Sequence, residues 1–239
     1  MMIKMVEQTF IIPAYNEEKR IINTLIKLTK YFEKTFRNYE IICIVDGIDN
    51  TDKIVNRMIK KNSKIKLLKF THRLGKGGAI VEGVKKARGK KLMVIDADIS
   101  IPLKSISKMI NLLEEYDIVS GSRFFNKSKI KSPIYRKFLS QACNLLERKF
   151  FGLKISDPQF GFKAYRKNVI KKLIKLTTIN NFAWDLETMI NAQNKGFLIK
   201  DLPIDYFYTK YSKVNVFSTT KQILFSILKL KILNSLKIN

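Results

Sequence analysis

Hydrophobic residues along the chain follow two alternating patterns. Short runs that are apolar almost throughout are typical of strands buried on both faces, and longer stretches with apolar residues every three or four positions are typical of helices. The predicted strands are residues 8–13, 40–47, 64–70, 91–98 and 117–123. One predicted helix follows each of the first four strands, and these helices are residues 14–34, 49–61, 77–89 and 102–115. This alternation predicts an α/β fold, with a mostly parallel sheet covered by helices on both faces.

The pattern changes after residue 124. Residues 134–151 form a predicted helix whose apolar side chains fill one half of the helical wheel. That half contains Ile134, Tyr135, Phe138, Leu139, Ala142, Cys143, Leu145, Leu146 and Phe150. The other half contains Arg136, Lys137, Asn144, Glu147 and Arg148. Two alternatives stay open for the apolar half: a membrane surface, or packing against the sheet or a second copy of the chain.

Residues 222–237 are apolar almost all round but contain Lys229 and Lys231. This segment is too short and too rich in lysine to span a bilayer, and no other run approaches the ~18 apolar residues that a span needs. Such a segment suits anchoring at a membrane interface, and a helix docked on the core is the alternative. The predicted organisation is therefore a main domain over residues 1–215 and a basic, apolar C-terminal helix over residues 216–239.

Each predicted strand ends in polar or glycine-rich residues. These endings are residues 13–17, 46–47, 72–78, 96–98 and 121–123. A single ending of this kind is weak evidence, because turns favour Asp and Gly in any case. The carboxyl ends of parallel strands meet at one edge of a sheet, however, and ligands bind there. Five such endings therefore predict a ligand site at that edge.

Two of these endings suggest specific chemistry. Asp96 and Asp98, separated only by Ala97, could share a hard divalent cation or the hydroxyls of a ribose, and the alternative is a solvated strand end. The glycine-rich loop around Lys76 could present backbone N–H groups to a phosphate at a helix N-terminus, and the alternative is an ordinary turn. The neighbouring His72 is expected to position other groups rather than to bind a metal.

The charge of the chain is strongly positive and uneven. There are 46 Lys and Arg against 20 Asp and Glu, a net charge of +26. Residues 121–239 contain 23 of the basic but only 6 of the acidic side chains. This excess implies a polyanionic partner: a phosphorylated substrate, an anionic membrane surface or nucleic acid. Nucleic acid ranks last, because no recognisable binding module is present. Cys43 and Cys143 lack metal-like spacing, which is typical of a reduced, cytosolic protein.

Several motifs, taken together and in order, resemble those of glycosyltransferase family 2. They are "IPAYNEE", "VDGIDNTD", "LGKGGAIVEGVKKARG", "DAD", "SGSRF", "DPQFGFKAYRK" and "FAWDLE", and the resemblance covers roughly residues 9–215. More narrowly, the chain resembles dolichyl-phosphate glucosyltransferases and mannose synthases. It departs from them in "VDGIDN", where "VDDGS" is usual, so that only Asp46 corresponds clearly. The membrane segments frequent in that family are absent from the sequence.

The resemblance implies a GT-A fold, Rossmann-like, and a nucleotide-sugar donor. The donor would be held by Pro13, Tyr15, Glu17, Asp46, Lys76 and Asp96. Asp96 and Asp98 would bind Mg²⁺ or Mn²⁺ at the diphosphate. Arg123 and Lys163 would align the phosphate of the acceptor, with a surface salt bridge as the alternative for Arg123. Asp185 and Glu187 would orient the substrate, unless they only cap a helix.

The expected reaction is transfer of a hexose to a polyprenyl (dolichyl) phosphate with inversion, on the cytoplasmic face of the membrane, by a peripheral protein. UDP-glucose is favoured over GDP-mannose as the donor because the residues of the motifs are more similar to those of the glucosyltransferase branch of the family. The acceptor phosphate is already an anionic nucleophile at neutral pH, so a general base is less needed than for a sugar hydroxyl. The alternative is a saccharide hydroxyl as acceptor, in which case Asp185 should be indispensable as the base.

Overall fold

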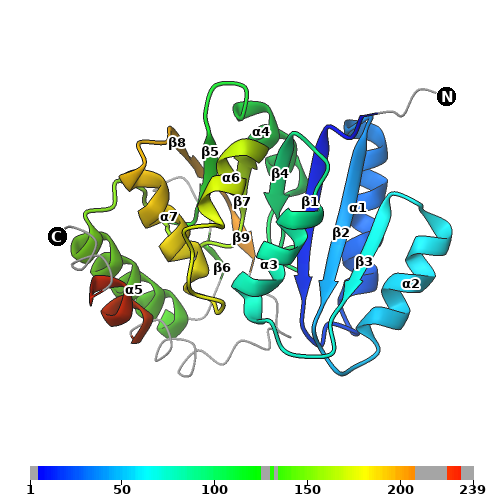
Figure 1. The fold of residues 1–239 in the computed structure, drawn as a ribbon, viewed down its shortest axis with the longest axis horizontal. Helices are drawn as coiled ribbons and strands as arrows, with labels where there is room; N and C mark the ends of the chain where they lie inside the picture. Colours follow the sequence, from blue (N-terminus) through cyan, green and yellow to red (C-terminus); the bar gives the residue numbers. More distant parts are fainter. Residues whose placement is uncertain (1–4, 125–129, 132–133, 208–224, 233–239) are drawn as a thin grey trace.

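A seven-stranded sheet in the order β3-β2-β1-β4-β7-β5-β8 forms the centre of the computed structural model, which describes residues 5–124, 130–131, 134–207 and 225–232 (Figure 1). Its strands are β1 (Gln8–Ala14), β2 (Tyr39–Val45), β3 (Ile65–Lys69), β4 (Lys91–Val94), β5 (Ile118–Ser122), β7 (Lys163–Arg166) and β8 (Ile199–Pro203). All are parallel except β7, which is antiparallel to both β4 and β5. β6 (Ile130–Lys131) and β9 (Tyr206–Phe207) form a separate parallel pair.

Helices cover both faces of this sheet (Figure 1). They are α1 (Ile21–Thr35), α2 (Thr51–Lys61), α3 (Gly75–Lys86), α4 (Leu103–Leu112), α5 (Ile134–Phe151), α6 (Lys167–Leu173) and α7 (Trp184–Asn194). Because successive side chains of a strand point to opposite faces, β1 contributes to two cores. Phe10 and Ile12 pack with α1, α2 and α4, while Ile11 packs with α3, α6 and α7. This arrangement confirms the predicted α/β fold with a mostly parallel sheet.

The five predicted strands and the four helices between them are all present, with shifted ends. The largest shift is at α1, which begins at Ile21 rather than at residue 14. Asn16 has a positive φ of 54°, which is incompatible with a continuing right-handed helix, and the turn after it places Glu17 and Arg20 near the strand ends. After α5, the predicted C-terminal helix contains the observed helical segment 225–232, whereas β7, α6, α7, β8 and β9 were not predicted individually.

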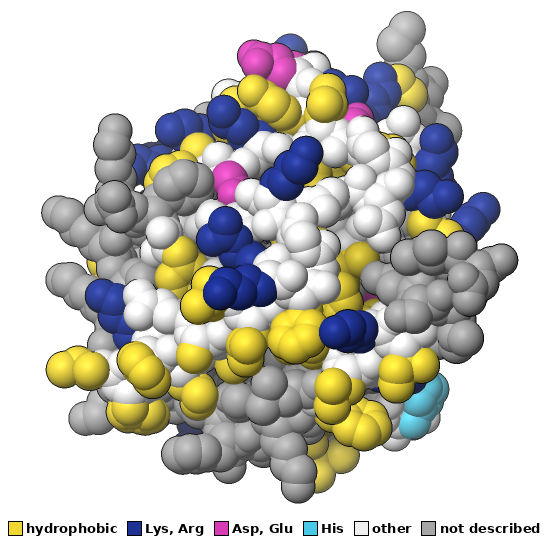
Figure 2. Space-filling view, turned by 90° about the vertical axis from the view of Figure 1, so that its left-hand side faces the viewer, with side chains coloured by type: hydrophobic (Ala, Val, Ile, Leu, Met, Phe, Trp, Pro, Cys, Tyr) yellow, Lys and Arg dark blue, Asp and Glu magenta, His cyan; other side chains and the backbone are white. Residues whose placement is uncertain are grey.

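The helix α5 is oriented with its apolar half outward. Ile134, Tyr135 and Phe138 are 87%, 58% and 73% exposed, whereas Asn144 and Glu147 are buried. Residues 225–232 form a helical segment beside it, where the Lys231 Nζ lies 4.6 Å from the centre of the Phe150 ring. Figure 2 views this side of the molecule and shows hydrophobic side chains spread across its lower half, with Lys and Arg among and above them.

One side of segment 225–232 is docked on the core, as one of the two alternatives for the C-terminal helix predicted, and the other side is exposed. Ile227 and Leu230 are buried in the core formed by α3, α6 and α7, while Phe225 and Leu228 are 71% and 60% exposed. The remainder of the predicted helix, residues 222–224 and 233–237, lies outside the described residues, as does the predicted domain boundary at residue 215. Among the helices that the structure describes, none is both long and apolar enough to cross a bilayer.

Candidate active site

The antiparallel strand β7 explains how a lysine joins the predicted edge of the sheet. The parallel strands β4 and β5 end at this edge, and an antiparallel neighbour therefore begins there. Lys163, the first residue of β7, lies opposite Val94 at the end of β4 and opposite Ser120 in β5. The edge thus collects Asp96, just after β4, Arg123, just after β5, and Lys163 within one small region.

Two lysines and two aspartates form a chain of ion pairs at this edge. The Lys76 Nζ lies 3.1 Å from Asp96 Oδ1 and 3.4 Å from Asp185 Oδ2. The other carboxylate oxygen of Asp185 lies 3.3 Å from the Lys163 Nζ, which also donates to the carbonyl oxygen of Phe160. Asp185 comes from the first turn of α7, so it is the shared counter-ion of two ammonium groups that arrive from α3 and β7.

The two lysines of this chain have different electrostatic environments. Burial lowers the pKa of Lys163, and Asp185 and Asp157 only partly oppose that effect. Burial acts on Lys76 in the same direction, but Asp96 and Asp185 together outweigh it and hold its pKa above the usual value. The Lys163 side chain is completely buried, so its ammonium group pairs with Asp185 inside the protein and does not face solvent. The predicted contact of Lys163 with an acceptor phosphate remains a proposal.

Asp98 lies apart from this chain, on the side of α1. Its Oδ2 accepts from Arg20 Nη1 at 3.3 Å, and its Oδ1 accepts from Ser100 Oγ at 3.3 Å. Arg20 also donates to Glu17, one of the residues predicted to hold the donor. Glu17 and Asp98 are therefore joined through one guanidinium group, which sequence analysis did not identify because it lies within the first predicted helix.

Backbone strain also gathers at this edge. Among the described residues other than glycine, positive φ angles occur only at Asn16 (54°) and Ile99 (37°). Asn tolerates this region, but a β-branched residue there costs on the order of 1–3 kcal/mol. Ile99 directly follows Asp98. The surrounding fold thus holds the chain that carries both predicted metal-binding carboxylates in a conformation it would not adopt alone.

The glycine-rich loop differs from its predicted role. The Asp46 Oδ2 accepts from the backbone N–H groups of Leu74 and Gly75, and the carbonyl oxygen of Asn180 accepts from those of Gly77 and Gly78. These four amides at the start of α3 are therefore already bonded within the protein, and they are not offered to a phosphate in this structure. Of the predicted phosphate-binding groups, the side chain of Lys76 is the one that reaches the site.

Asp46 is also bound by an arginine that the motifs did not reveal. Arg73 Nη1 donates to the Asp46 carboxylate at 2.5 Å, and the same guanidinium group lies 3.6 Å from the centre of the Tyr15 ring. Tyr15 is 43% exposed, whereas the Asp46 carboxylate is almost completely buried. The predicted donor residue Pro13 lies next to them in β1, paired with Ile44. The Tyr15 side chain, with Arg73 over one face of its ring, is thus the more accessible part of the predicted base-binding group.

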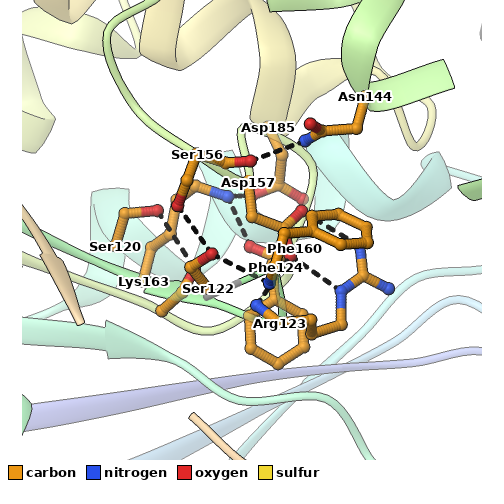
Figure 3. Close-up of polar contacts among 11 residues, drawn as sticks. Ser120, Ser122, Arg123, Phe124, Asn144, Ser156, Asp157, Phe160, Lys163 and Asp185 are labelled. Carbon is orange, nitrogen blue, oxygen red and sulfur yellow. Dashed lines mark hydrogen bonds and ion pairs between the residues drawn. The ribbon is translucent and has the colours of Figure 1, made fainter. Parts of the chain in front are cut away.

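A second buried network surrounds Arg123 (Figure 3). The Asp157 carboxylate accepts from the backbone N–H of Arg123 and from its Nε and Nη2 at 2.8 to 3.1 Å. The Phe160 ring centre lies 4.9 Å from the same guanidinium group. Arg123 is therefore part of a fixed internal ion pair, which is stronger than the surface salt bridge considered as its alternative.

Glu147 lies behind this network and has the most unusual carboxyl group at the site. It is 1% exposed and accepts from the Gln159 Nε2. Burial raises the pKa of Glu147 to about 8; the Asp157 carboxylate acts in the same direction, and Arg123 and Lys163 oppose it. The sequence pattern predicts Glu147 on the polar half of α5, and the structure turns this part of that half inward.

This pKa gives a prediction about stability. Because the folded state holds the Glu147 proton up to about pH 8 while the unfolded chain releases it near its ordinary value of 4.5, folding stability should fall as pH rises between these values. The loss is on the order of 1 kcal/mol for each pH unit in that window. In urea unfolding at pH 5, 6.5 and 8, Glu147→Gln should match the native chain at pH 5 and exceed it at pH 8. Parallel pH profiles for the two proteins would contradict this.

The carboxylates at the strand ends fit a hard divalent cation. Asp96 and Asp98 offer only oxygen atoms, which Mg²⁺ and Mn²⁺ prefer. Within the described residues there is no cluster of three or more His, Cys, Asp or Glu that could hold a metal. The described part of the chain thus supplies at most two carboxylates here, which is the pattern of a cation completed by substrate phosphates. Gly161 adds to the fit, because a Cβ there would lie 2.6 Å from Asp96 Oδ2.

Comparison with known proteins agrees with this geometry. The family model described as Glycosyl transferase family 2 matches residues 9–174. Glycosyltransferase AglD of Haloferax volcanii is 31% identical over 206 residues, which cover 84% of this chain and 33% of AglD. The dolichyl-phosphate beta-glucosyltransferase of Dictyostelium discoideum is 28% identical over 237 residues, covering 92% of this chain and 72% of that protein. The dolichyl-phosphate beta-glucosyltransferase ALG5D of Trichomonas vaginalis is 30% identical over 224 residues, which cover 87% of this chain and 68% of that protein.

Solved structures match the fold at lower sequence identity. Glucosyl-3-phosphoglycerate synthase from Mycobacterium tuberculosis, in complex with Mn²⁺, UDP and glucosyl-3-phosphoglycerate, superposes with a TM-score of 0.71 at 14% identity, covering 95% of this chain and 80% of that one. This likeness shows the GT-A fold. The chain spans only about a third of AglD but more than two thirds of the other two relatives. The family match extends from β1 through α6 and so includes Asp96, Asp98, Arg123 and Lys163, and the chain belongs to glycosyl transferase family 2.

Proposed function

We propose that this protein transfers glucose from UDP-glucose to a polyprenyl (dolichyl) phosphate with inversion. The observation that carries the proposal is the edge of the sheet, where two carboxylates suited to a cation lie beside a line of lysine and arginine side chains. Two relatives that cover 87–92% of the chain are named dolichyl-phosphate beta-glucosyltransferases, which supports the choice of sugar and acceptor. GDP-mannose is the alternative donor.

On the donor side, the aromatic face of Tyr15 would receive the base, and Glu17 and Asp46 would lie near the nucleoside. Asp96 and Asp98 would hold a Mg²⁺ or Mn²⁺ ion, whose charge would offset that of the departing diphosphate. Structures of glucosyl-3-phosphoglycerate synthase with Mn²⁺ and with Mg²⁺ support this choice of cation. The Lys76 ammonium group, 3.1 Å from Asp96, would add a second positive charge at the same place.

On the acceptor side, an oxygen of the polyprenyl phosphate would attack the anomeric carbon as the bond from that carbon to the diphosphate breaks. The attacking phosphate is an anion at neutral pH, so the step requires no proton acceptor. The position of Asp185 agrees with this, because both of its oxygens are paired with lysines. Arg123, whose side chain is 21% exposed, is the proposed contact for the acceptor phosphate. The buried Lys163 would help to align that phosphate from within the protein.

We further infer that the protein binds the anionic cytoplasmic face of a membrane as a peripheral protein. The apolar half of α5 and segment 225–232 lie side by side, with Lys231 over the Phe150 ring, and both expose apolar side chains: Phe138, Leu145, Phe225 and Leu228. Lys137, Lys149 and Lys229 are exposed on the same two segments. Apolar side chains flanked by lysines match the chemistry of a bilayer with acidic headgroups, and the phosphate of a prenyl acceptor lies at that level.

This inference predicts salt-sensitive binding to vesicles. At low salt the full chain should co-sediment with vesicles containing phosphatidylserine, and it should release as salt is raised because the lysine contribution is screened. Phe138→Ser combined with Phe225→Ser should weaken binding by about tenfold, through the loss of two inserted aromatic side chains. Ile26→Ser, on the half-exposed outer face of α1, is the matched control and should bind as the native chain does. Equal binding by all three proteins would exclude this surface.

Release of nucleoside diphosphate tests the function. Purified protein with Mg²⁺ or Mn²⁺ should release UDP from UDP-glucose only when a short polyprenyl phosphate is added, and should form a glucosyl lipid phosphate. Release of GDP from GDP-mannose under the same conditions would change the donor and keep the acceptor. Transfer to a saccharide hydroxyl but not to the lipid phosphate would replace the proposal.

A further inference from the structure

The inner face of α5 is hydrogen-bonded to the loop that precedes β7. Asn144 Nδ2 donates to the carbonyl oxygen of Ser156 at 2.8 Å, and Glu147 accepts from Gln159 Nε2. Both side chains of α5 are buried, although they lie on a helix whose opposite half is exposed and apolar. Two successive turns of α5 are thus bonded to Gln159 in the loop and to Ser156, the residue just before it, and Figure 3 shows the Ser156 contact beside Asp157.

The loop of residues 157–161 lies against four charged residues of the site. Asp157 binds the guanidinium group of Arg123 through two hydrogen bonds, and the carbonyl oxygen of Phe160 accepts from Lys163. At the end of the loop, Gly161 lies so close to the Lys76–Asp96 ion pair that a Cβ would come within 2.5 Å of the Lys76 Nζ. A shift of the loop would therefore move or release groups on both the donor and acceptor sides.

We propose that Glu147 is a positioning residue for transfer, acting through Gln159 to hold the 157–161 loop in register with Arg123, Lys163 and the Asp96 carboxylate. The proposal rests on the proposed function for its kinetic consequence, but the contact itself does not. Glu147 is 1% exposed and bonded to Gln159, so it acts on the site through the loop. Their effect should therefore appear in the rate of the chemical step and in the order of the loop rather than in donor affinity.

The protonation state of the Glu147 carboxyl group is part of this role. The ionisable groups that face it are Asp157 from the loop, Arg123 from the end of β5 and Lys163 from β7, with Cys143 one turn away on α5. Below about pH 8 the carboxyl group is neutral, so it can accept from Gln159 without competing with Asp157 for the Arg123 guanidinium group. Glutamine has the same shape and keeps the acceptor oxygen, whereas leucine keeps the bulk and removes the hydrogen bond.

Hydrogen exchange tests the contact without any substrate. In the full chain, Glu147→Leu and Gln159→Leu should each increase amide exchange in residues 156–163 by at least about tenfold, and Glu147→Gln should leave it close to native. Glu115→Leu, at an exposed site after α4, is the matched control and should change nothing in this loop. Native exchange in the loop of both leucine variants would overturn the proposal, whatever the reaction turns out to be.

Kinetics then test the consequence. With UDP-glucose and a short polyprenyl phosphate, each leucine variant should lose about ten- to a hundredfold in kcat with little change in KM for UDP-glucose. The double variant should lose no more than either single variant, because both remove one contact. Glu147→Gln should restore kcat to within about threefold at pH 7. Additive losses, or a loss confined to KM for the donor, would overturn the positioning role. An inactive native chain would instead reject the proposed function and leave the exchange result to decide on the contact.

Discussion

Asp98→Ala is expected to lower the rate of transfer by at least about a thousandfold while the protein stays folded. The carboxylate is one of the two proposed ligands of a divalent cation, and loss of charge stabilisation at a departing diphosphate is worth several kcal/mol. Each ~1.4 kcal/mol is a tenfold change in rate. The hydrogen bonds that Asp98 accepts from Arg20 and Ser100 are both 3.3 Å long and therefore weak, so their loss should cost little stability.

Steady-state release of UDP, with polyprenyl phosphate present, measures this effect, and circular dichroism with urea unfolding checks the fold. Glu114→Ala is the matched control, because Glu114 also pairs with a lysine, Lys91, but at the opposite edge of the sheet. The control should keep native activity, and chelation with EDTA should reduce the native protein to the level of Asp98→Ala. Full activity in EDTA, or an active Asp98→Ala protein, would exclude a metal role for this residue.

Asp185→Ala is expected to destabilise the fold by about 3–5 kcal/mol. The substitution leaves the fully buried ammonium group of Lys163 with no carboxylate partner, and breaking one side of a buried ion pair has a cost of this size. A second substitution, Lys163→Met, should recover most of the loss because it removes the unpaired charge and keeps an apolar side chain of similar length. Urea unfolding of the two single variants and the double variant measures the coupling.

Glu82→Ala provides the comparison for this cycle. Glu82 pairs with Lys85 on the outer face of α3, and an exposed pair of this kind contributes about 0.5 kcal/mol or less. A loss in Asp185→Ala no larger than in Glu82→Ala would show that the two lysines do not depend on Asp185. If Asp185→Asn instead folds normally and loses all transfer, Asp185 acts as a base, and the saccharide-acceptor alternative gains support.

Local sequence patterns were sufficient for the first half of the fold. Each of the first four strands is an apolar run followed by an amphipathic stretch, so periodicity alone located them, and the acids at Asp96 and Asp98 marked the edge of the sheet. The strand β7 could not be found in this way. Its four residues begin and end in Lys163 and Arg166, and they form a strand because β4 and β5 pair with them on both sides.

The charged residues were identified more successfully than their partners. Lys76 and Asp185 were both selected from motifs, but their contact joins α3 to α7 over more than a hundred residues, and no local pattern encodes it. The same holds for Arg73, which binds Asp46. Glu147 was the opposite case: periodicity located it on the polar half of α5, but did not indicate that the fold buries this side chain against Gln159.

The central position of β7 also has a consequence for the order in which the protein forms. β4 and β5 are consecutive strands in the chain, yet they do not pair with each other and are joined only through residues 163–166. On a ribosome, the emerging chain therefore presents two open strand edges until these residues have been made. Such edges invite association with other chains, and pairing across long sequence separations is slow. Nascent chains of intermediate length should consequently depend on protection by chaperones, and truncation before residue 163 should yield aggregates rather than a smaller stable domain.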